Sequence, residues 1–256
     1  MERVGGERTF LGVIIPAYNE EERLPRTLAR VVEYYSAQEY SWSVTVVSDG
    51  SRDGTEAVVR EFSAREPRVS LMAYSPNRGK GAAVREAMLN VDAELLLFCD
   101  ADLATPQEET EKLLAAIDSG AMIAIGSRPL RDSNLEVRQP RYRELLGRIF
   151  NKTVQLLAVP GIDDTQCGFK LFRRSAAREV FSRCKLDGFG FDFESMMIAR
   201  DLELPIAEVG VRWSHQDGSK VSMLRDGPRM LRDLLKLRMA GKRSRLAVNP
   251  SLPLPR

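Results

Sequence analysis

FLGVIIPAYNEEERLPRTLARVVEYYSAQEYSWSVTVV, residues 10–47, determines the fold class. Two short runs rich in Val and Ile, Phe10–Ala17 and Trp42–Val47, enclose a longer amphipathic segment, Glu20–Ala37. Short runs without polar alternation are typical of strands covered on both faces, and the longer segment, which follows Asn19, is typical of a capped helix. A strand–helix–strand unit predicts two parallel strands joined by a right-handed crossover.

The same alternation continues to residue 126. The further strands and helices that it predicts are, in chain order, helix Asp53–Arg65, strand Val69–Tyr74, helix Gly79–Asn90, strand Glu94–Cys99, helix Pro106–Asp118 and strand Ala121–Gly126. This order predicts an α/β fold with a Rossmann-like, mostly parallel sheet that is flanked by helices.

The pattern changes after Ser127. The arginine-rich segment Arg128–Arg143 contains two prolines and is predicted as a loop. The next predicted elements are helix Glu144–Val159, helix Phe191–Asp201, strand Ile206–Trp213 and a basic amphipathic helix, Pro228–Arg238. We therefore expect one domain over residues 10–238, a flexible N-terminus over 1–9 and a flexible basic tail over 239–256.

Composition excludes several classes of protein. A formal net charge of +2 argues against a dedicated nucleic-acid binder. The three cysteines form no CxxC pair, which favours reduced thiols in a cytoplasmic protein over a zinc site or disulfide framework. No apolar run approaches the roughly 18–20 residues that span a bilayer, and residues 1–8 lack the apolar region of a signal peptide. We expect a protein that does not cross the membrane, and peripheral attachment stays open.

Three polar clusters follow predicted strands: Tyr18–Glu20, Ser48–Ser51 and Asp100–Asp102. In an open parallel sheet, ligands bind outside the carboxyl ends of the strands. The clusters are therefore expected to meet at one edge of the sheet and to form a binding site.

Asp100-Ala101-Asp102 is the sharpest of these signals. Two carboxylates one residue apart can hold Mg²⁺ or Mn²⁺, which in turn can hold a diphosphate. The alternative is an acidic turn and helix cap. Asp49 could accept hydrogen bonds from a base or ribose, or could simply form an Asp-Gly turn. Lys80, in NRGKG, could approach phosphates, although a glycine turn opening a helix is the alternative.

Together these motifs resemble a known family. VIIPAYNEE (residues 13–21), SDGSRDGT (48–55) and DAD (100–102) are similar to the inverting family 2 glycosyltransferases, which have the GT-A fold. GSR (126–128), DTQCGFKLF (164–172), FDFE (191–194), IAEV (206–209) and the run from 213 to 220 resemble the polyprenyl-phosphate sugar synthases, in particular the dolichyl-phosphate β-glucosyltransferases. The resemblance covers about residues 10 to 238.

The resemblance implies roles for individual residues. The donor nucleotide sugar would be bound by Pro16, Tyr18, Glu20, Asp49, Lys80, Asp100, Ala101, Asp102, Ser219 and Lys220, the last two on a loop that closes over it. Asp100 and Asp102 would carry the metal and the diphosphate. Arg128, with Arg138 or Arg143, would hold the acceptor phosphate. Two departures are expected to matter: Ser48 replaces the first aspartate of the family's Asp-Asp-Gly-Ser, and we expect no N-terminal membrane anchor of the kind that the eukaryotic enzymes have.

A phosphate acceptor changes the catalytic requirement. It is already anionic and can attack without a general base, so arginines and a metal must offset the repulsion between two phosphates. Residues 128–148 contain six arginines, which could instead be a solvated basic loop. Asp164 and Asp192 are candidate bases if the acceptor is a hydroxyl; otherwise Asp164 would orient the loop. His215 could be a metal ligand or a surface residue.

We therefore predict a hexosyltransferase that moves glucose from UDP-glucose to a polyprenyl phosphate of the dolichyl type, with inversion, at the cytosolic membrane face. Alternatives are GDP-mannose as donor, a soluble acceptor such as a phosphorylated small acid, and a nucleotide-sugar-binding regulator without turnover. The helices Pro228–Arg238 and Glu144–Val159 could dock on an anionic bilayer, or could pack their apolar sides on the sheet.

Overall fold

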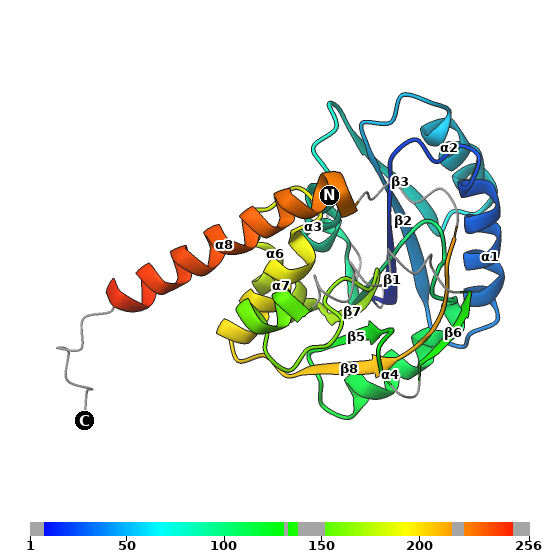
Figure 1. Ribbon diagram of the computed structural model, residues 1–256. Coiled ribbons are helices and arrows are strands. Elements are labelled where there is room, and N and C mark those ends of the chain that lie inside the picture. The colour runs from blue at the N-terminus through cyan, green and yellow to red at the C-terminus, as the bar shows by residue number, and fades with distance from the viewer. Residues whose placement is uncertain (1–7, 131–132, 138–151, 217–222, 248–256) are drawn as a thin grey trace, which may run out of the picture.

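A seven-stranded sheet with the order β3-β2-β1-β4-β7-β5-β8 forms the centre of the computed structural model (Figure 1). The structure describes residues 8–130, 133–137, 152–216 and 223–247. The strands are β1 (Thr9–Ala17), β2 (Trp42–Asp49), β3 (Val69–Tyr74), β4 (Ala93–Cys99), β5 (Ile123–Ser127), β7 (Phe169–Arg173) and β8 (Ile206–Gly210). A second sheet pairs β6 (Asn134–Val137) with β9 (Arg212–Ser214) in parallel.

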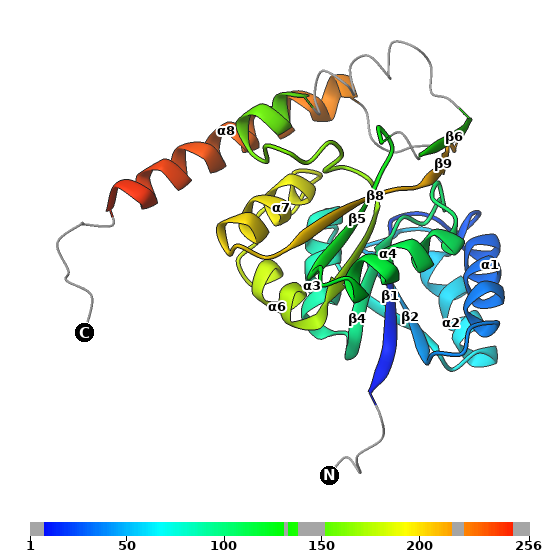
Figure 2. The ribbon, with the colours of Figure 1, turned by 90° about the horizontal axis from the view of Figure 1, so that it is seen from below.

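Helices cover both faces of the large sheet (Figures 1 and 2). The helices are α1 (Leu24–Ser36), α2 (Thr55–Arg65), α3 (Lys80–Asn90), the 3₁₀ turn η1 (Gln107–Glu109), α4 (Thr110–Asp118), α6 (Arg174–Phe181), α7 (Phe191–Asp201) and α8 (Met223–Ala247). Helices α1, α2 and α4 pack on one face through residues such as Leu28, Val59 and Leu113. Helices α3, α6 and α7 pack on the other through Val84, Val180 and others. The result is a three-layer α/β/α domain, because each strand buries apolar side chains on both faces.

The expected α/β fold with a mostly parallel sheet is confirmed. All five strands predicted before residue 127 are present, and β1, β2, β3 and β4 pair in parallel, as do β5 and β8. The four predicted helices between those strands are also present, with α1 starting later than expected, at Leu24. The strand order reverses at β1, which lies between β2 and β4. The crevice beside such a reversal is where ligands bind in open α/β sheets.

Several predictions after residue 127 were wrong in detail. Strand β7 was not predicted and pairs antiparallel with both β4 and β5. Residues 134–137 form β6 within the segment predicted as a loop. The strand predicted over Ile206–Trp213 is two strands, because the chain leaves β5 after Gly210 and enters the small sheet at Arg212. Of the helix predicted over Glu144–Val159, residues 152–157 are helical and 138–151 lie outside the described residues.

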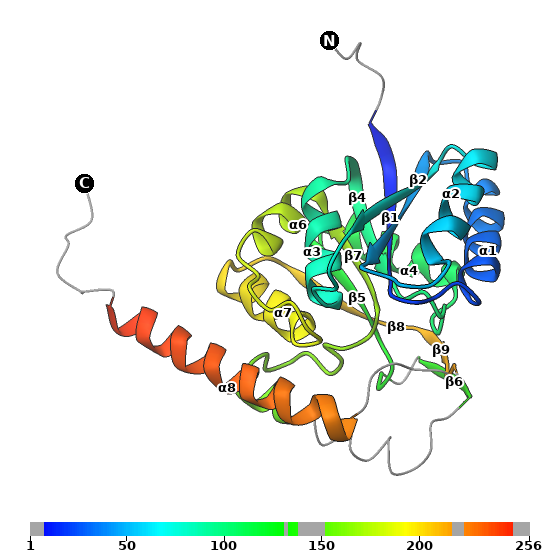
Figure 3. The ribbon, with the colours of Figure 1, turned by 90° about the horizontal axis from the view of Figure 1, so that it is seen from above.

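Helix α8 is longer than predicted at both ends. It begins at Met223, so Pro228 lies inside it, and it continues to Ala247, beyond the expected boundary at Arg238. The rest of the expected tail, residues 248–256, lies outside the described residues. In Figure 3, α8 runs away from the sheet, with only its first half beside the domain.

The apolar residues of α8 divide between two sides. Met230 and Leu234 are buried against Val154 and Phe193. For these two residues the alternative prediction, ordinary packing of an apolar side, is confirmed. They pack on α7 and residues 152–157, however, and not on the sheet as that alternative expected. Leu231, Leu235 and Met239 are exposed, the last to 61 %. These three lie four residues apart and share one side of the helix.

Candidate active site

The loops that follow β1 and β2 are joined by side-chain hydrogen bonds. The backbone N–H of Asn19 donates to Ser51 Oγ at 3.1 Å, and the N–H of Arg52 donates to Asn19 Oδ1 at 2.8 Å. Glu21 Oε2 accepts from the N–H of Gly54 at 2.6 Å. Asn19 has a φ of 52°, a left-handed conformation that asparagine tolerates. The two loops therefore form one rim at the carboxyl edge of the sheet.

The residues expected at the nucleoside lie on or near this rim. Pro16 and Tyr18 are half-buried at the end of β1. Glu20 accepts a hydrogen bond from Arg23 at 2.8 Å, and its N–H donates to Thr55 Oγ1 at the same distance. These contacts hold the segment in place at the carboxyl end of β1.

Asp49 is used differently from the expectation. Its side chain is buried, and its carboxylate accepts hydrogen bonds from Asn77 Nδ2 (2.8 Å), Arg78 N–H (2.7 Å) and Gly79 N–H (2.8 Å). Gly50, with a φ of +65°, passes so close that an added Cβ would lie 2.5 Å from the backbone nitrogen of Asn77. Asp49 thus orders the loop before α3, and a contact with the nucleoside stays a prediction.

Asp100 and Asp102 lie on the turn that follows β4. The N–H of Asp100 donates to the carbonyl of Gly168 at 3.1 Å, and Asp102 Oδ1 accepts from the N–H of Ala104 at 3.0 Å. A Cβ on Gly168 would lie 2.0 Å from Asp100 Oδ2, so only glycine fits beside this carboxylate. Burial, and then the negative charge of Asp100, raise the pKa of Asp102. Two crowded carboxylates of this kind attract a cation.

Lys80 is the cation that the structure places on this pair. Its Nζ lies 2.6 Å from Asp100 Oδ1 and 5.2 Å from the centre of the Phe98 ring. Burial alone would lower the pKa of Lys80, but the charges of Asp100 and Asp192 outweigh burial and raise it. The NRGKG segment therefore opens α3 with a glycine turn and brings Lys80 to Asp100, and an approach of Lys80 to phosphate stays a prediction.

A small cavity lies beside the aspartates. Its lining includes Asp100, Asp102, Thr105, Gly168 and Trp213, so it joins the turn after β4 to strand β9. His215 follows on the same segment, with its ring 6.1 Å from that of Trp213. Within the described ranges, no three His, Cys, Asp or Glu side chains form a group that could hold a metal ion. A role for His215 as a third ligand therefore stays a prediction.

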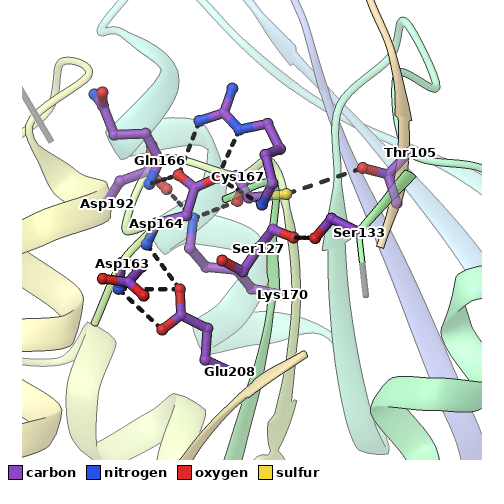
Figure 4. A network of polar contacts seen from close by, with 11 residues as sticks. Thr105, Ser127, Ser133, Asp163, Asp164, Gln166, Cys167, Lys170, Asp192 and Glu208 are labelled. Carbon is purple, nitrogen blue, oxygen red and sulfur yellow. Dashed lines mark hydrogen bonds and ion pairs between the residues drawn. The ribbon is translucent and has the colours of Figure 1, made fainter. Parts of the chain in front are cut away.

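Arg128 follows β5 and is held by Asp164, which is labelled in the polar network of Figure 4. The guanidinium donates to the carboxylate twice, from Nε at 2.6 Å and from Nη2 at 2.8 Å, and the N–H groups of Arg128 and Gln166 donate at 3.2 and 3.1 Å. Burial alone would raise the pKa of Asp164, but Arg128 outweighs burial and lowers it. A buried carboxylate with four donors suits the orienting role rather than that of a general base.

Glu208 on β8 completes the support of this pair. Its carboxylate accepts from the N–H of Asp164 at 2.7 Å and from the N–H of Asp163 at 2.9 Å. The side chain of Arg128 is about a quarter exposed, with 26 % of its surface accessible, and its Cζ lies 5.6 Å from the centre of the Trp213 ring. Arg128 is thus held by Asp164, partly exposed, and close to Trp213, which lines the cavity.

A second buried ion pair was missed from the sequence. Lys170, in the middle of β7, forms an ion pair with Asp192 at the start of α7 and donates to the carbonyl of Cys167 at 2.6 Å. Both side chains are almost fully buried. This arrangement gives Asp192 a structural role, and its alternative role as a base for a hydroxyl acceptor stays a prediction. The signal was available, because a lysine within the apolar run FKLF needs a buried acid.

Four predicted site residues cannot be placed. Arg138 and Arg143, predicted at the acceptor phosphate, and Ser219 and Lys220, predicted over the donor, lie outside the described residues. Across the described part of the chain, no helix is long and apolar enough to cross a membrane.

Comparison with known proteins shows the family of the chain. Residues 12–181 match the family described as "Glycosyl transferase family 2". The protein named "Dolichyl-phosphate beta-glucosyltransferase" in Drosophila melanogaster is 39 % identical over 242 residues, which cover 89 % of this chain and 74 % of that protein. Its namesake in Homo sapiens is 35 % identical over 242 residues, which cover 90 % of this chain and 75 % of that protein.

Solved structures share the fold at lower identity. Glucosyl-3-phosphoglycerate synthase from Mycobacterium tuberculosis, in complex with Mn²⁺ and UDP-glucose, is similar with a TM-score of 0.66 and 17 % identity, over 90 % of this chain and 79 % of that one. Mannosyl-3-phosphoglycerate synthase from Rubrobacter xylanophilus has a TM-score of 0.67 and 20 % identity, over 96 % and 79 %. With the motif resemblance and the geometry above, these matches lead to one conclusion: the chain belongs to glycosyl transferase family 2 and is a glycosyltransferase of the GT-A fold.

Proposed function

We propose that this enzyme transfers glucose from UDP-glucose to a polyprenyl phosphate of the dolichyl type, with a divalent metal and with inversion at the anomeric carbon. The observation that carries the proposal is the arrangement of two charged sites near one residue, Trp213. An aspartate pair suited to a metal-bound diphosphate lies on one side, and Arg128, suited to a second phosphate, faces the same Trp213. Relatives of 35–39 % identity named for dolichyl phosphate and glucose support the choice of substrates.

The residues at the turn after β4 fit a divalent metal. Asp100 and Asp102 would hold Mg²⁺ or Mn²⁺, which commonly takes one or two carboxylates together with substrate phosphates. The raised pKa of Asp102 supports this fit, because the crowded pair is relieved by a cation. When bound, the metal supplies charge neutralisation on the diphosphate that leaves. The Mn²⁺ complex of the M. tuberculosis structure is consistent with this choice.

The proposed reaction does not require a general base from the protein. An oxygen of the acceptor phosphate forms a bond to the anomeric carbon, while the bond from that carbon to the diphosphate oxygen breaks and its electron pair leaves with UDP. The acceptor oxygen is already ionised, so no proton has to be removed. Arg128 would bind the acceptor phosphate, and Asp164 would fix the guanidinium with two of its nitrogens already bonded. Lys80, released from Asp100 by the metal, would be free to contact donor phosphate.

The remaining predicted residues complete the proposal. Arg138 or Arg143 would add a second guanidinium at the acceptor phosphate, and Ser219 and Lys220 would close over the donor. His215 would approach the metal from the same segment. Pro16, Tyr18, Glu20 and Asp49 would border the uridine.

A donor-by-acceptor panel tests the proposed reaction. Radiolabelled UDP-glucose and GDP-mannose are each offered with a short polyprenyl phosphate or with a phosphorylated small acid, in Mn²⁺ or excess chelator, and the label is phase-partitioned. Label from UDP-glucose in the lipid phase, abolished by chelator, supports the proposal. Label confined to the water phase with the small acid would favour a soluble acceptor. Nucleotide-sugar binding without any turnover would favour the regulator.

We also propose that α8 brings the enzyme to an anionic bilayer surface. Leu231, Leu235 and Met239 are exposed on one side of the helix, and exposed basic residues flank them: Arg229, Arg232, Lys236 and Arg238. Basic amphipathic helices bury such apolar residues in the interface and gain roughly 1 kcal/mol per basic residue near anionic lipid.

Vesicle co-sedimentation tests this docking. Wild-type protein should bind vesicles with phosphatidylserine at low salt and release at high salt. The variant Arg232→Glu should bind less, whereas Arg65→Glu, on α2, should bind as wild type does. No binding at low salt, together with full activity on a water-soluble acceptor, would remove the membrane from the proposal.

A further inference from the structure

Trp213 is an aromatic residue at the junction of the two charged sites. It lines the cavity with Asp100, Asp102 and Gly168, and its ring centre lies 5.6 Å from Cζ of Arg128. The residue is half-buried, so part of its surface remains available to a ligand. An indole that served only to fill the core would be packed among apolar side chains, whereas this one borders two aspartates.

The strand that carries Trp213 is fixed to both sites. On the side of the aspartates, the N–H of Ser214 donates to the carbonyl of Ala104 at 2.8 Å, and Arg212 Nε donates to Glu109 Oε1 at 2.6 Å. On the side of Arg128, the N–H of Val211 donates to the carbonyl of Ser127 at 3.3 Å. The position of the indole relative to both charged groups is therefore set by backbone contacts on either side of it.

We infer that Trp213 is the platform on which the transferred hexose ring rests. The inference rests on the proposed function, because that reaction fixes where the sugar must lie. The anomeric carbon is bonded to the donor diphosphate and is attacked by the acceptor phosphate, so the ring lies between the groups that hold them. A pyranose presents a face of C–H groups, and the negative face of an aromatic ring attracts such polarised hydrogens.

Contact of Trp213 with the hexose and a merely supporting role of Trp213 predict different effects on the binding of UDP-glucose and of UDP. If Trp213 contacts the hexose, its loss weakens binding of UDP-glucose but not of UDP, which has no sugar to stack. If Trp213 only supports Arg128 or the turn after β4, its loss affects both nucleotides equally or neither. The ratio of the two affinities therefore measures the inferred contact.

Intrinsic fluorescence gives a direct reading of this contact, because the chain has two tryptophans. Trp42 is buried at the start of β2, with the Arg68 guanidinium 3.9 Å from its ring centre, and it lies at the opposite end of the strands from the site. In the variant Trp42→Phe, or Trp42→Tyr should the first be unstable, Trp213 is the single emitter. With Mn²⁺ present, UDP-glucose should change its emission more than UDP does.

The affinity experiment uses wild type, Trp213→Leu and Trp213→Phe, titrated with UDP-glucose and with UDP in Mn²⁺ by calorimetry. Trp213→Leu should bind UDP-glucose roughly three- to tenfold more weakly, with UDP unchanged, and Trp213→Phe should recover most of the loss. An unchanged ratio of the two affinities in Trp213→Leu, or an equal loss for both nucleotides, would overturn the inference. Failure of wild-type protein to bind UDP-glucose would instead show that the proposed donor is wrong.

Discussion

Replacing Gly168 by alanine should disable the metal site while the fold survives. The new Cβ would lie 2.0 Å from Asp100 Oδ2, about 1.4 Å short of an ordinary contact. The backbones cannot separate easily, because Asp100 N–H donates to the Gly168 carbonyl and Cys99 pairs with Phe169 in the sheet. The Asp100 side chain must therefore turn away, and this movement breaks its ion pair with Lys80 and removes it from the proposed metal position.

The magnitude follows from these contacts. Overpacking of a tight site costs about 1–3 kcal/mol, which lowers the melting temperature of a chain of this size by roughly 2–12 °C. Displacing one of two carboxylates should weaken Mn²⁺ binding by at least the roughly 10–100-fold seen when a ligand's support is removed. Manganese affinity, measured by electron paramagnetic resonance with UDP present, and thermal unfolding by circular dichroism report the two effects separately.

Gly188→Ala is the matched control, because a Cβ there meets nothing within 4 Å. It should leave the Mn²⁺ affinity and the melting temperature close to those of wild type. Wild-type Mn²⁺ affinity and turnover in Gly168→Ala would refute the reasoning, since they would mean that Asp100 does not need its present position.

Four further predictions concern the aspartate pair and the two buried ion pairs. Asp102→Ala should abolish transfer and leave the circular dichroism spectrum unchanged; wild-type turnover would remove the metal from the mechanism. Arg128→Ala should lower transfer by about 1.5–3 kcal/mol of transition-state stabilisation while UDP affinity, measured by calorimetry, stays the same; equal losses would place it at the donor. Lys170→Met should lower the free energy of unfolding in urea by about 3–5 kcal/mol, because Asp192 is left buried without a partner, and Lys170→Met with Asp192→Leu should recover most of the loss. Arg128 lowers the pKa of Asp164, so the stability that this pair contributes is present above the unfolded value, about 3.9, and is lost as pH falls through the lower folded value; the difference in unfolding free energy between wild type and Asp164→Asn should therefore be constant near neutral pH and shrink below pH 4.

The first half of the fold could be predicted because its signals are local. Each strand there is a continuous apolar run, and each helix is amphipathic and begins after a turn residue, so no distant information is needed. Asp100 and Asp102 could be predicted as candidate site residues for the same reason, because they directly follow a strand. The second half of the fold depends on which strands pair across the sheet, and a local sequence pattern does not reveal this pairing.

Strand β7 is an element that the local sequence pattern did not predict. Lys170 interrupts its apolar run, and the lysine is tolerated only because Asp192, from α7, reaches it inside the protein. Asp49 shows a second limit: its place after β2 could be predicted, but its hydrogen bonds to residues 77–79 depend on a distant loop that a local pattern does not reveal. A strand that changes sheets near Val211 likewise depends on partners, β5 and then β6, that a local pattern does not reveal.

The place of β7 in the sheet has a consequence for the order in which the protein folds. Strands β1 to β4 are contiguous in sequence and can assemble while the chain is still being made. One edge of β4, with Leu95, Leu96 and Leu97, then stays uncovered until the ribosome has added Phe169–Arg173. An unpaired apolar edge is a template for intermolecular pairing. The nascent enzyme is therefore most exposed to intermolecular strand pairing in the interval between synthesis of β4 and synthesis of β7.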